Sequence, residues 1–242
     1  MRLVEHWTAT GDTLFRHRSW LPLLLIPIVL LSFLGRRDPF SSHTAGLIWE
    51  LGCFAIVLVG VALRVVTTGT SPRGTSGRNT REQKAATLNT TGPYSIVRHP
   101  LYVANFLIAL GVSLFPRAWC LPIIVSLATV LYYERIAARE EEFLDARFGA
   151  AFRRWADAVP AVVPSFRAWR PPAQRFDGRR ALEREFYVVS EVAVAFFVLD
   201  VLGDYAAHGR LELDPVWTTV AALGVALFVV MWTRKKLRRR SR

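Results

Sequence analysis

The sequence predicts an all-α fold, a polytopic membrane bundle of about six transmembrane helices. The chain has 242 residues, 52% of them hydrophobic, and a formal net charge of +12. Its mean hydropathy is +0.27. Soluble domains rarely combine so much apolar content with so large a positive charge, and the combination is typical of a membrane protein with basic loops.

Six apolar stretches are the predicted helices, and they span residues 20–34, 45–66, 101–115, 119–137, 186–202 and 216–232. A bilayer is crossed by about 17 to 25 helical residues, so several stretches are long enough and two are short. The first stretch has an alternative interpretation as a signal peptide, because Arg16 and Arg18 precede it. No small-residue cleavage site follows it, which favours an uncleaved helix.

Basic residues predict the orientation, because short cytoplasmic loops collect lysine and arginine. They are concentrated before residue 20, between residues 73 and 98, between 147 and 180, and after 233, so we expect both termini in the cytoplasm. The tail "RKKLRRRSR" directly follows an apolar helix. A basic run at that place indicates a topology anchor that contacts anionic lipids, rather than a nucleic-acid-binding segment.

The chain divides into three predicted parts. Residues 1–66 form an anchoring helical hairpin, residues 67–169 hold the unusual polar chemistry, and residues 170–242 begin with a proline-containing linker and end in a second hairpin. Cys53 and Cys120 lie at apolar stretches, so no disulfide is expected. The five histidines show no ligand spacing, so no metal site is expected.

The third apolar stretch has a polar entrance made of Arg98, His99 and Pro100. Proline is tolerated at the first turn of a helix, so a helix is expected to start at about this point. After Pro116 the chain returns through the fourth stretch, which continues as an amphipathic helix beyond the membrane. This hairpin is expected to bring Arg98 to the same membrane level as Glu140 and Glu141.

Other charged residues in the sequence indicate a functional role less specifically. The loop before Arg98 carries Arg78, Arg81 and Lys84 at helical spacing, which would place them on one face. Ionisable residues inside a membrane are costly and often functional, and Glu50, Glu191 and Asp200 are among those that fall within apolar stretches. We expect Asp200 to reach water because it lies near a helix end, and Glu50 and Glu191 to pair between helices.

Two motifs resemble those of a known family. The segments "GPYSIVRHPLYVAN" and "REEEFLDARFGAAFRRWADAVPAVVP" are similar to R-H-P-x-Y-x-G and E-E-x-x-L-x-x-x-F-G of the integral-membrane methyltransferases, which include isoprenylcysteine carboxyl methyltransferase and the phospholipid methyltransferases. The similarity covers residues 88–164, roughly a third of the chain. The family's glycine is replaced by Ala104, which takes up room near the cofactor or a packed helix. The matching residues are Arg98, His99, Pro100, Tyr102, Glu140, Glu141, Leu144, Phe148 and Gly149.

The resemblance implies S-adenosylmethionine as methyl donor, bound in a pocket at the cytoplasmic end of the hairpin. Arg98 and Glu141 would be catalytic, and carboxylates and aromatic faces would attract the sulfonium cation. Methyl transfer needs alignment more than acid or base, and alignment can contribute about 7 to 11 kcal/mol. The implied cofactor-binding residues are Tyr94, His99, Pro100, Tyr102, Glu140 and Glu141.

The acceptor is predicted from charge. The family methylates prenylated cysteine carboxylates, phosphatidylethanolamine amines and lipid phosphates, and a cation-rich loop favours O-methylation of an anionic lipid headgroup. The implied substrate-binding residues are Arg78, Arg81, Lys84 and Arg98. The loop is similar to that of bacterial enzymes that methylate a phosphate of lipid A, which implies a bacterial inner membrane.

Three alternatives remain open. Within the family they are isoprenylcysteine-type carboxyl methylation and phospholipid N-methylation; outside it, the chain could be a scaffold that gathers anionic lipids without chemistry. Each polar group also has a structural interpretation on its own. Arg98 and His99 could reach the headgroups, and Glu140 and Glu141 could lie on a solvated face.

Overall fold

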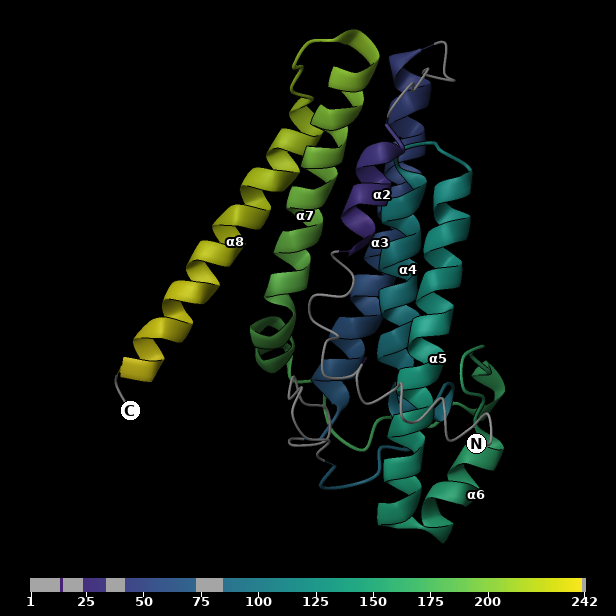
Figure 1. Cartoon of the computed structure of the whole chain (residues 1–242). Helices are drawn as coiled ribbons and strands as arrows, with labels where there is room; N and C mark the ends of the chain where they lie inside the picture. The colour runs from purple at the N-terminus through teal and green to yellow at the C-terminus, as the bar shows by residue number, and fades with distance from the viewer. Residues whose placement is uncertain (1–13, 15–23, 34–41, 73–84, 241–242) are drawn as a thin grey trace.

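The protein is an elongated bundle of helices, shown in Figure 1. The structure, a computed structural model, describes residues 14, 24–33, 42–72 and 85–240. Every element assigned within these ranges is helical, which confirms the all-α fold. The elements are α2 (Ile26–Leu31), α3 (His43–Thr70), η2 (Gly92–Ser95), α4 (Pro100–Leu114), α5 (Cys120–Phe148), α6 (Ala150–Ala158), η3 (Phe166–Ala168), α7 (Gly178–His208) and α8 (Pro215–Arg240).

Four of the described helices are long and apolar enough to cross a membrane: Thr44–Thr70, Cys120–Phe148, Gly178–His208 and Pro215–Arg238. They correspond to four of the six predicted spans. The helix predicted at residues 101–115 is α4, which has 15 residues and is therefore only about 22 Å long at 1.5 Å per residue. Of the first predicted span, residues 24–33 are described, and they contain α2.

Helix α3 is central, packing against α4 on one side and α7 on another, while α5 packs on α4 and α8 on α7. Glycines allow α3 and α4 to approach closely. A Cβ added at Gly111 would lie 2.5 Å from Cγ2 of Val57, and one added at Gly60 would lie 2.7 Å from the carbonyl oxygen of Ala104. Ala104 is fully buried. The alanine that replaces the expected glycine thus belongs to this contact between helices.

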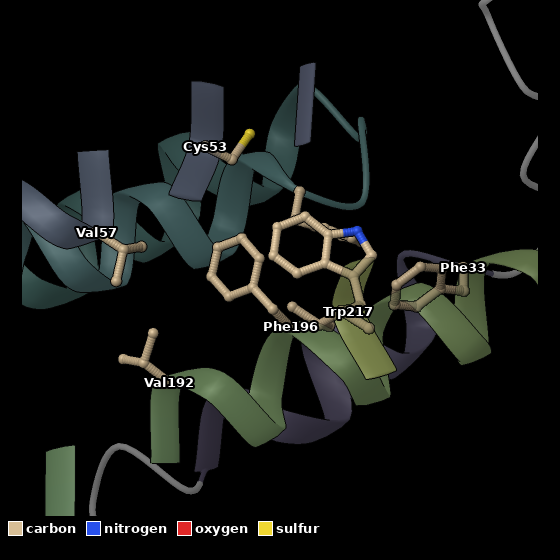
Figure 2. Packing of buried hydrophobic residues seen from close by; sticks show 8 residues of the cluster. Phe33, Cys53, Val57, Val192, Phe196 and Trp217 are labelled. Carbon is tan, nitrogen blue, oxygen red and sulfur yellow. The ribbon is translucent and has the colours of Figure 1, made fainter. Parts of the chain in front are cut away.

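A hydrophobic core joins α2, α3, α7 and α8 with the end of α4, as Figure 2 shows for Phe196 and Trp217. Their ring centroids are 5.1 Å apart. The core excludes water from aromatic and aliphatic side chains and holds the two halves of the bundle together. Its buried residues are Phe33, Cys53, Val57, Phe115, Val192, Phe196, Leu199 and Trp217.

Beside this core, hydrogen bonds of one glutamate connect separate parts of the bundle. Glu50 on α3 accepts hydrogen bonds from Nη2 of Arg117 and from Nε1 of Trp217, both at 2.8 Å. The expected pairing of Glu50 between helices is confirmed. The expectation for Asp200 was wrong, because this residue is 6% exposed. It lies on the inner face of α7, where helix–helix packing covers it despite its nearness to the helix end.

The opposite end of the bundle gathers the end of α3, the starts of α4 and α7 and the end of α5 (Figure 1). There, residues 160–173, which we call the crossing segment, run along the chain that precedes α4. The N–H groups of Arg98 and Ser165 donate to the carbonyls of Pro160 and Ile96 at 2.9 and 2.8 Å. The N–H of Gly92 donates to the carbonyl of Arg170 at 2.9 Å. These bonds fix the entrance of α4.

The amphipathic helix expected after the fourth apolar stretch is present but interrupted. Helix α5 runs to Phe148, and Gly149 then adopts a φ of 52° before α6 begins at Ala150. A left-handed conformation of this kind suits glycine, which has no Cβ. The break turns α6 so that Nε1 of Trp155 donates to the carbonyl of Tyr94 at 3.1 Å.

Candidate functional site

The entrance of α4 presents a histidine at the point where the helix begins. His99 is the N-cap residue, with φ −122° and ψ 65°, and Pro100 is the first helical residue. Proline fits this position because its missing N–H would have no partner inside the helix. The 3-10 turn η2, which ends at Ser95, and the bond from Arg98 to the crossing segment hold the preceding backbone. The backbone that carries Arg98 and His99 is therefore held in place.

The end of α5 supplies the carboxylates. Nη1 of Arg98 donates to Oε2 of Glu141 at 2.8 Å, and Nε2 of His99 lies 2.8 Å from Oε1 of the same carboxylate. Nδ1 of His99 is 3.7 Å from Oε2 of Glu140. The expected proximity of the two distant polar clusters is confirmed. One carboxylate is held by two cationic side chains, which is a stronger arrangement than a single surface ion pair.

The side chains of the cluster differ in how much solvent they reach. The side chain of His99 is 8% exposed, whereas those of Arg98 and Glu141 are 20% and 25% exposed. Nε of Arg98 is buried and makes no hydrogen bond to any residue that the structure describes. A buried donor without an acceptor is costly, so this atom is suited to an anionic oxygen of a bound molecule.

The neighbours of His99 favour its protonated form. Burial lowers the pKa of the imidazole, but the hydrogen bonds and negative charges of Glu140 and Glu141 outweigh burial and raise the pKa above its usual 6.5. The protonated ring can donate through both nitrogens, one towards each carboxylate. When His99 is protonated, the cluster brings two cationic and two acidic side chains into close contact.

Aromatic rings continue the site. The rings of His99 and Tyr102 are stacked with centroids 5.3 Å apart, and those of Tyr102 and Tyr133 with centroids 4.5 Å apart. Burial and the negative charge of Glu140 raise the pKa of Tyr94 to about 12, so its phenol is neutral near pH 7. The rings provide the polarisable surface that attracts a ligand cation.

Only one of the four predicted substrate-binding residues lies in the part of the chain that the structure describes. Arg98 lies in the cluster, whereas Arg78, Arg81 and Lys84 lie outside the described residues. The described start of that loop is tied to α7, because Nη1 of Arg180 donates to the carbonyl of Ser71 at 2.5 Å. Ser71 and Pro72, the last described residues before that loop, therefore lie close to the start of α7.

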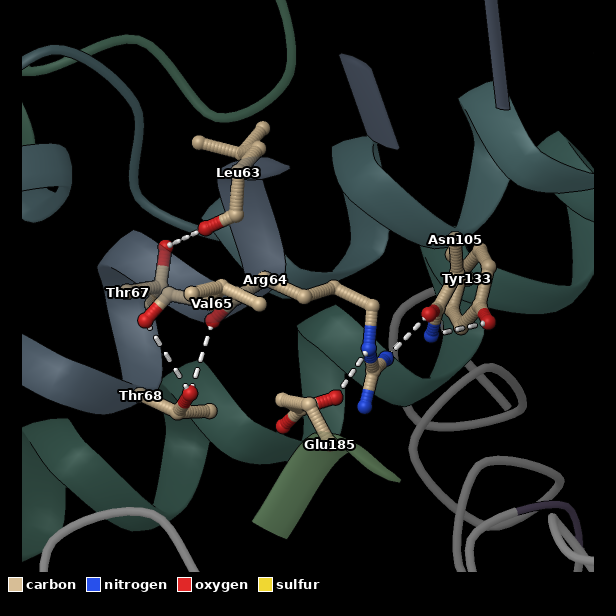
Figure 3. A network of polar contacts seen from close by, with 8 residues as sticks. All are labelled: Leu63, Arg64, Val65, Thr67, Thr68, Asn105, Tyr133 and Glu185. Atoms are coloured by element: carbon tan, nitrogen blue, oxygen red, sulfur yellow. Dashed lines mark hydrogen bonds and ion pairs between the residues drawn. The ribbon is translucent and has the colours of Figure 1, made fainter. Parts of the chain in front are cut away.

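Four polar residues beside the site were not predicted: Arg64 on α3, Asn105 on α4, Tyr133 on α5 and Glu185 on α7, shown in Figure 3. They form one connected chain of hydrogen bonds. A signal existed for one of them, since Arg64 is an arginine inside a predicted span, where charge is costly. Glu185, the partner of Arg64, precedes its apolar stretch by one residue and is 121 positions away, so no local pattern pointed to it.

Metal ligands do not gather in the described ranges, where no group of three or more histidine, cysteine, aspartate or glutamate side chains could hold a metal ion.

Comparison with known proteins identifies the family. A family model for phospholipid methyltransferases matches residues 51–151, which contain α4 and the carboxylate pair. The protein-S-isoprenylcysteine O-methyltransferase of Schizosaccharomyces pombe is 30% identical over 84 residues, 35% of this chain and 36% of that protein. The cobalt-zinc-cadmium resistance protein CzcN of Cupriavidus metallidurans is 32% identical over 163 residues, 67% of this chain and 70% of CzcN. The chain belongs to the isoprenylcysteine and phospholipid methyltransferase family.

A further relative of this methyltransferase is the nickel-cobalt-cadmium resistance protein NccN of Alcaligenes xylosoxydans xylosoxydans, which is 29% identical over 157 residues, 65% of this chain and 69% of NccN. No solved structure matches the chain. The family and the four apolar helices together make the chain an integral membrane protein. The resemblance seen in the two sequence motifs is confirmed.

The raised pKa of His99 predicts how stability depends on pH. The protonated imidazole is stabilised by two carboxylates, so its contribution is complete below the unfolded pKa of about 6.5. It is lost as pH rises through the higher folded-state pKa. We therefore expect the methyltransferase to melt at a higher temperature than His99→Gln at pH 6, with the difference shrinking as pH rises. Thermal unfolding in detergent at a series of pH values measures it; a difference that grows with pH would contradict the assignment.

Proposed function

We propose that this methyltransferase transfers a methyl group from S-adenosylmethionine to an anionic oxygen of a lipid headgroup, with a lipid phosphate such as that of lipid A as the favoured acceptor. The observation that carries the proposal is the cluster of Arg98, His99, Glu140 and Glu141 at one end of the bundle. In it, the buried Nε of Arg98 has no hydrogen-bond partner among the described residues. Family membership supplies the reaction class.

The residues present fit the proposed donor. S-adenosylmethionine carries a carboxylate, an ammonium group and a sulfonium cation. The unpaired Nε of Arg98 suits the carboxylate, and Glu140 suits the ammonium group. Tyr94 and Tyr102 suit the sulfonium through their rings. Pro100 and His99 would shape the wall of the same pocket, where the helix entrance is buried.

The side chains act by holding reactants rather than by moving protons. S-adenosylmethionine held by these residues would supply an electrophilic methyl group to the acceptor oxygen and would leave as the neutral thioether. Glu141, fixed by Arg98 and His99, keeps the polar wall of the pocket rigid. Orientation of this kind can contribute about 7 to 11 kcal/mol to lowering the barrier.

The distribution of basic residues supports the proposed methyl acceptor and the proposed orientation in the membrane. An anionic oxygen is already nucleophilic and is attracted by cations, and the loop of Arg78, Arg81 and Lys84 is connected to both α3 and the entrance of α4. The basic end of α8 lies towards the same end of the bundle as the site (Figure 1). We propose that this end faces the cytoplasm, with both termini, in a bacterial inner membrane whose anionic lipids it contacts.

A labelled-donor assay tests the proposal. Purified protein in detergent is incubated with methyl-labelled S-adenosylmethionine and, separately, with lipid A, a farnesylated cysteine and phosphatidylethanolamine. We expect label in lipid A, in a product that resists mild alkali as a phosphate methyl diester does. Alkali-labile label in the farnesylated cysteine would replace the phosphate by a carboxylate acceptor, and label in phosphatidylethanolamine would indicate N-methylation. No transfer to any of the three or to a bacterial lipid extract would favour the lipid-gathering scaffold.

A further inference from the structure

Large apolar side chains are exposed along the crossing segment and just after it. Each of the five residues is at least half exposed, and the highest values are 76% for Val163 and 74% for Phe166. Phe166 begins η3 and Trp169 follows it, so these two side chains, three positions apart, leave the same side of a 3-10 turn. A group of exposed apolar side chains indicates a surface that binds a protein or a membrane. We call the group the apolar patch, and its members are Val162, Val163, Phe166, Trp169 and Phe176.

Hydrogen bonds place the patch at the level where the apolar helices end. The N–H of Ser165 donates to the carbonyl of Ile96 at 2.8 Å, four residues before α4 begins. The N–H of Asp177 donates to the carbonyl of Gly69 at 3.0 Å, one residue before α3 ends. The ring of Phe176 lies against the same glycine, where an added Cβ would collide with it. The patch therefore lies at the boundary of the membrane-spanning part of the bundle.

The chain returns to this level from farther out. Helices α5 and α6 project beyond the end of α3 at the lower end of the bundle in Figure 1. The end of α6 is back beside η2, because Nε1 of Trp155 donates to the carbonyl of Tyr94 at 3.1 Å. The crossing segment then leads to the start of α7, which is a membrane-spanning helix. The patch is thus carried by a connection that does not span the membrane but runs along its boundary.

Arginines accompany the patch. Residues 160–180 contain a single acidic residue, Asp177, whose side chain accepts a hydrogen bond from the N–H of Arg180 at 3.0 Å and caps α7. Aromatic rings beside arginines are typical of the membrane–water interface, where the rings lie at headgroup level and the cations attract anionic lipids. A second copy of the chain fits less well, because two such patches would bring like charges together. The arginines are Arg167, Arg170, Arg175, Arg179 and Arg180.

We propose that the apolar patch inserts into the lipid leaflet at this end of the bundle, at the boundary between headgroups and acyl chains, and that the arginines around it contact anionic headgroups. The inserted segment also fixes the depth of the entrance of α4. The N–H of Arg98 donates to the carbonyl of Pro160 at 2.9 Å, and the N–H of Arg170 donates to Oγ of Ser95 at 2.9 Å. The backbone before α4 is thereby held at the level of the lipid headgroups.

Spin labels measure the depth of the patch. Cys120 is exposed and Cys53 is buried, so Cys120→Ser gives a background in which only an added cysteine should react. Val163→Cys and Phe166→Cys are labelled in this background, in nanodiscs of phosphatidylethanolamine and phosphatidylglycerol. We expect collisions with oxygen, which concentrates in the bilayer, to exceed collisions with a water-soluble nickel chelate, at a depth of about 5 to 10 Å. Arg153→Cys is the matched control on α6, where the side chain is 62% exposed, and nickel collisions should dominate there.

A crosslinking measurement avoids the influence of the label itself. Full-length protein with p-benzoylphenylalanine in place of Phe166 keeps an aromatic side chain at this position and is irradiated in the same nanodiscs. We expect an adduct whose intact mass exceeds that of the protein by one phospholipid. The same replacement at Arg153 should give no lipid adduct.

Two outcomes would overturn the insertion. Nickel-dominated collisions at Val163 and Phe166, equal to those at Arg153, would show that the patch lies in water. Low collisions with both reagents would show that protein covers it, and a crosslinked dimer would identify a second copy of the chain as the cover. Neither measurement depends on methyl transfer, so either outcome would leave the proposed function in place.

Discussion

Replacing Glu141 by glutamine is expected to abolish methyl transfer, with a fall in kcat/KM of at least about 100-fold, the size seen when reactants are misplaced by about 1 Å. The carboxylate receives Nη1 of Arg98 on one oxygen and Nε2 of His99 on the other. An amide of the same shape offers only one oxygen, so one of the two cationic groups loses its acceptor. The proposed donor site then loses its fixed geometry. The labelled-donor assay measures the effect.

The adjacent carboxylate provides the control for this prediction. Glu142 pairs with Arg139 at 2.6 Å on the exposed side of α5, with side chains 53% and 33% exposed. Glu142→Gln should therefore keep wild-type turnover. Arg98→Ala should behave like Glu141→Gln, because it removes the other half of the pair. Wild-type turnover in both Glu141→Gln and Arg98→Ala, with both proteins folded, would remove the proposed site.

Replacing Glu185 by leucine is expected to produce the largest loss of stability, about 3 to 5 kcal/mol in the free energy of unfolding. The change leaves the guanidinium of Arg64 without its counter-charge where its side chain is 14% exposed. The double variant Arg64→Met with Glu185→Leu removes both charges and should recover most of the loss, because an apolar pair can replace a buried ion pair. Chemical unfolding in detergent micelles measures both.

Glu183 is the matched control on the same helix. It pairs with Arg179 and Arg238 at the surface, and its side chain is 45% exposed. Glu183→Leu should change stability by less than about 1 kcal/mol, since exposed ion pairs contribute little. A double variant that remains as unstable as Glu185→Leu would show that the cost comes from packing rather than from the unpaired charge of Arg64.

Much of the site was predictable because its parts are local. The motif around Arg98 and the carboxylates at Glu140 and Glu141 are each contiguous, and a helical hairpin of known rise returns the chain to its starting level. Helix boundaries were less predictable. The stretch at residues 186–202 is the apolar part of α7, which extends from Gly178 to His208 because polar residues at both ends continue the helix. The break at Gly149 depends on a backbone conformation that periodicity does not report.

The sequence by itself determined the helical class, most of the membrane spans, the family and the meeting of Arg98 with Glu141, because hydrophobic length and short motifs are properties of neighbouring residues. Only the tertiary structure decided which buried charges are partners. Arg64 and Glu185 meet across 121 positions because α3 and α7 pack together, and Asn105 joins them because α4 approaches α3 closely at Gly60 and Gly111. Such pairing depends on which helix faces are in contact, and hydropathy along one helix carries no information about the partner it will meet.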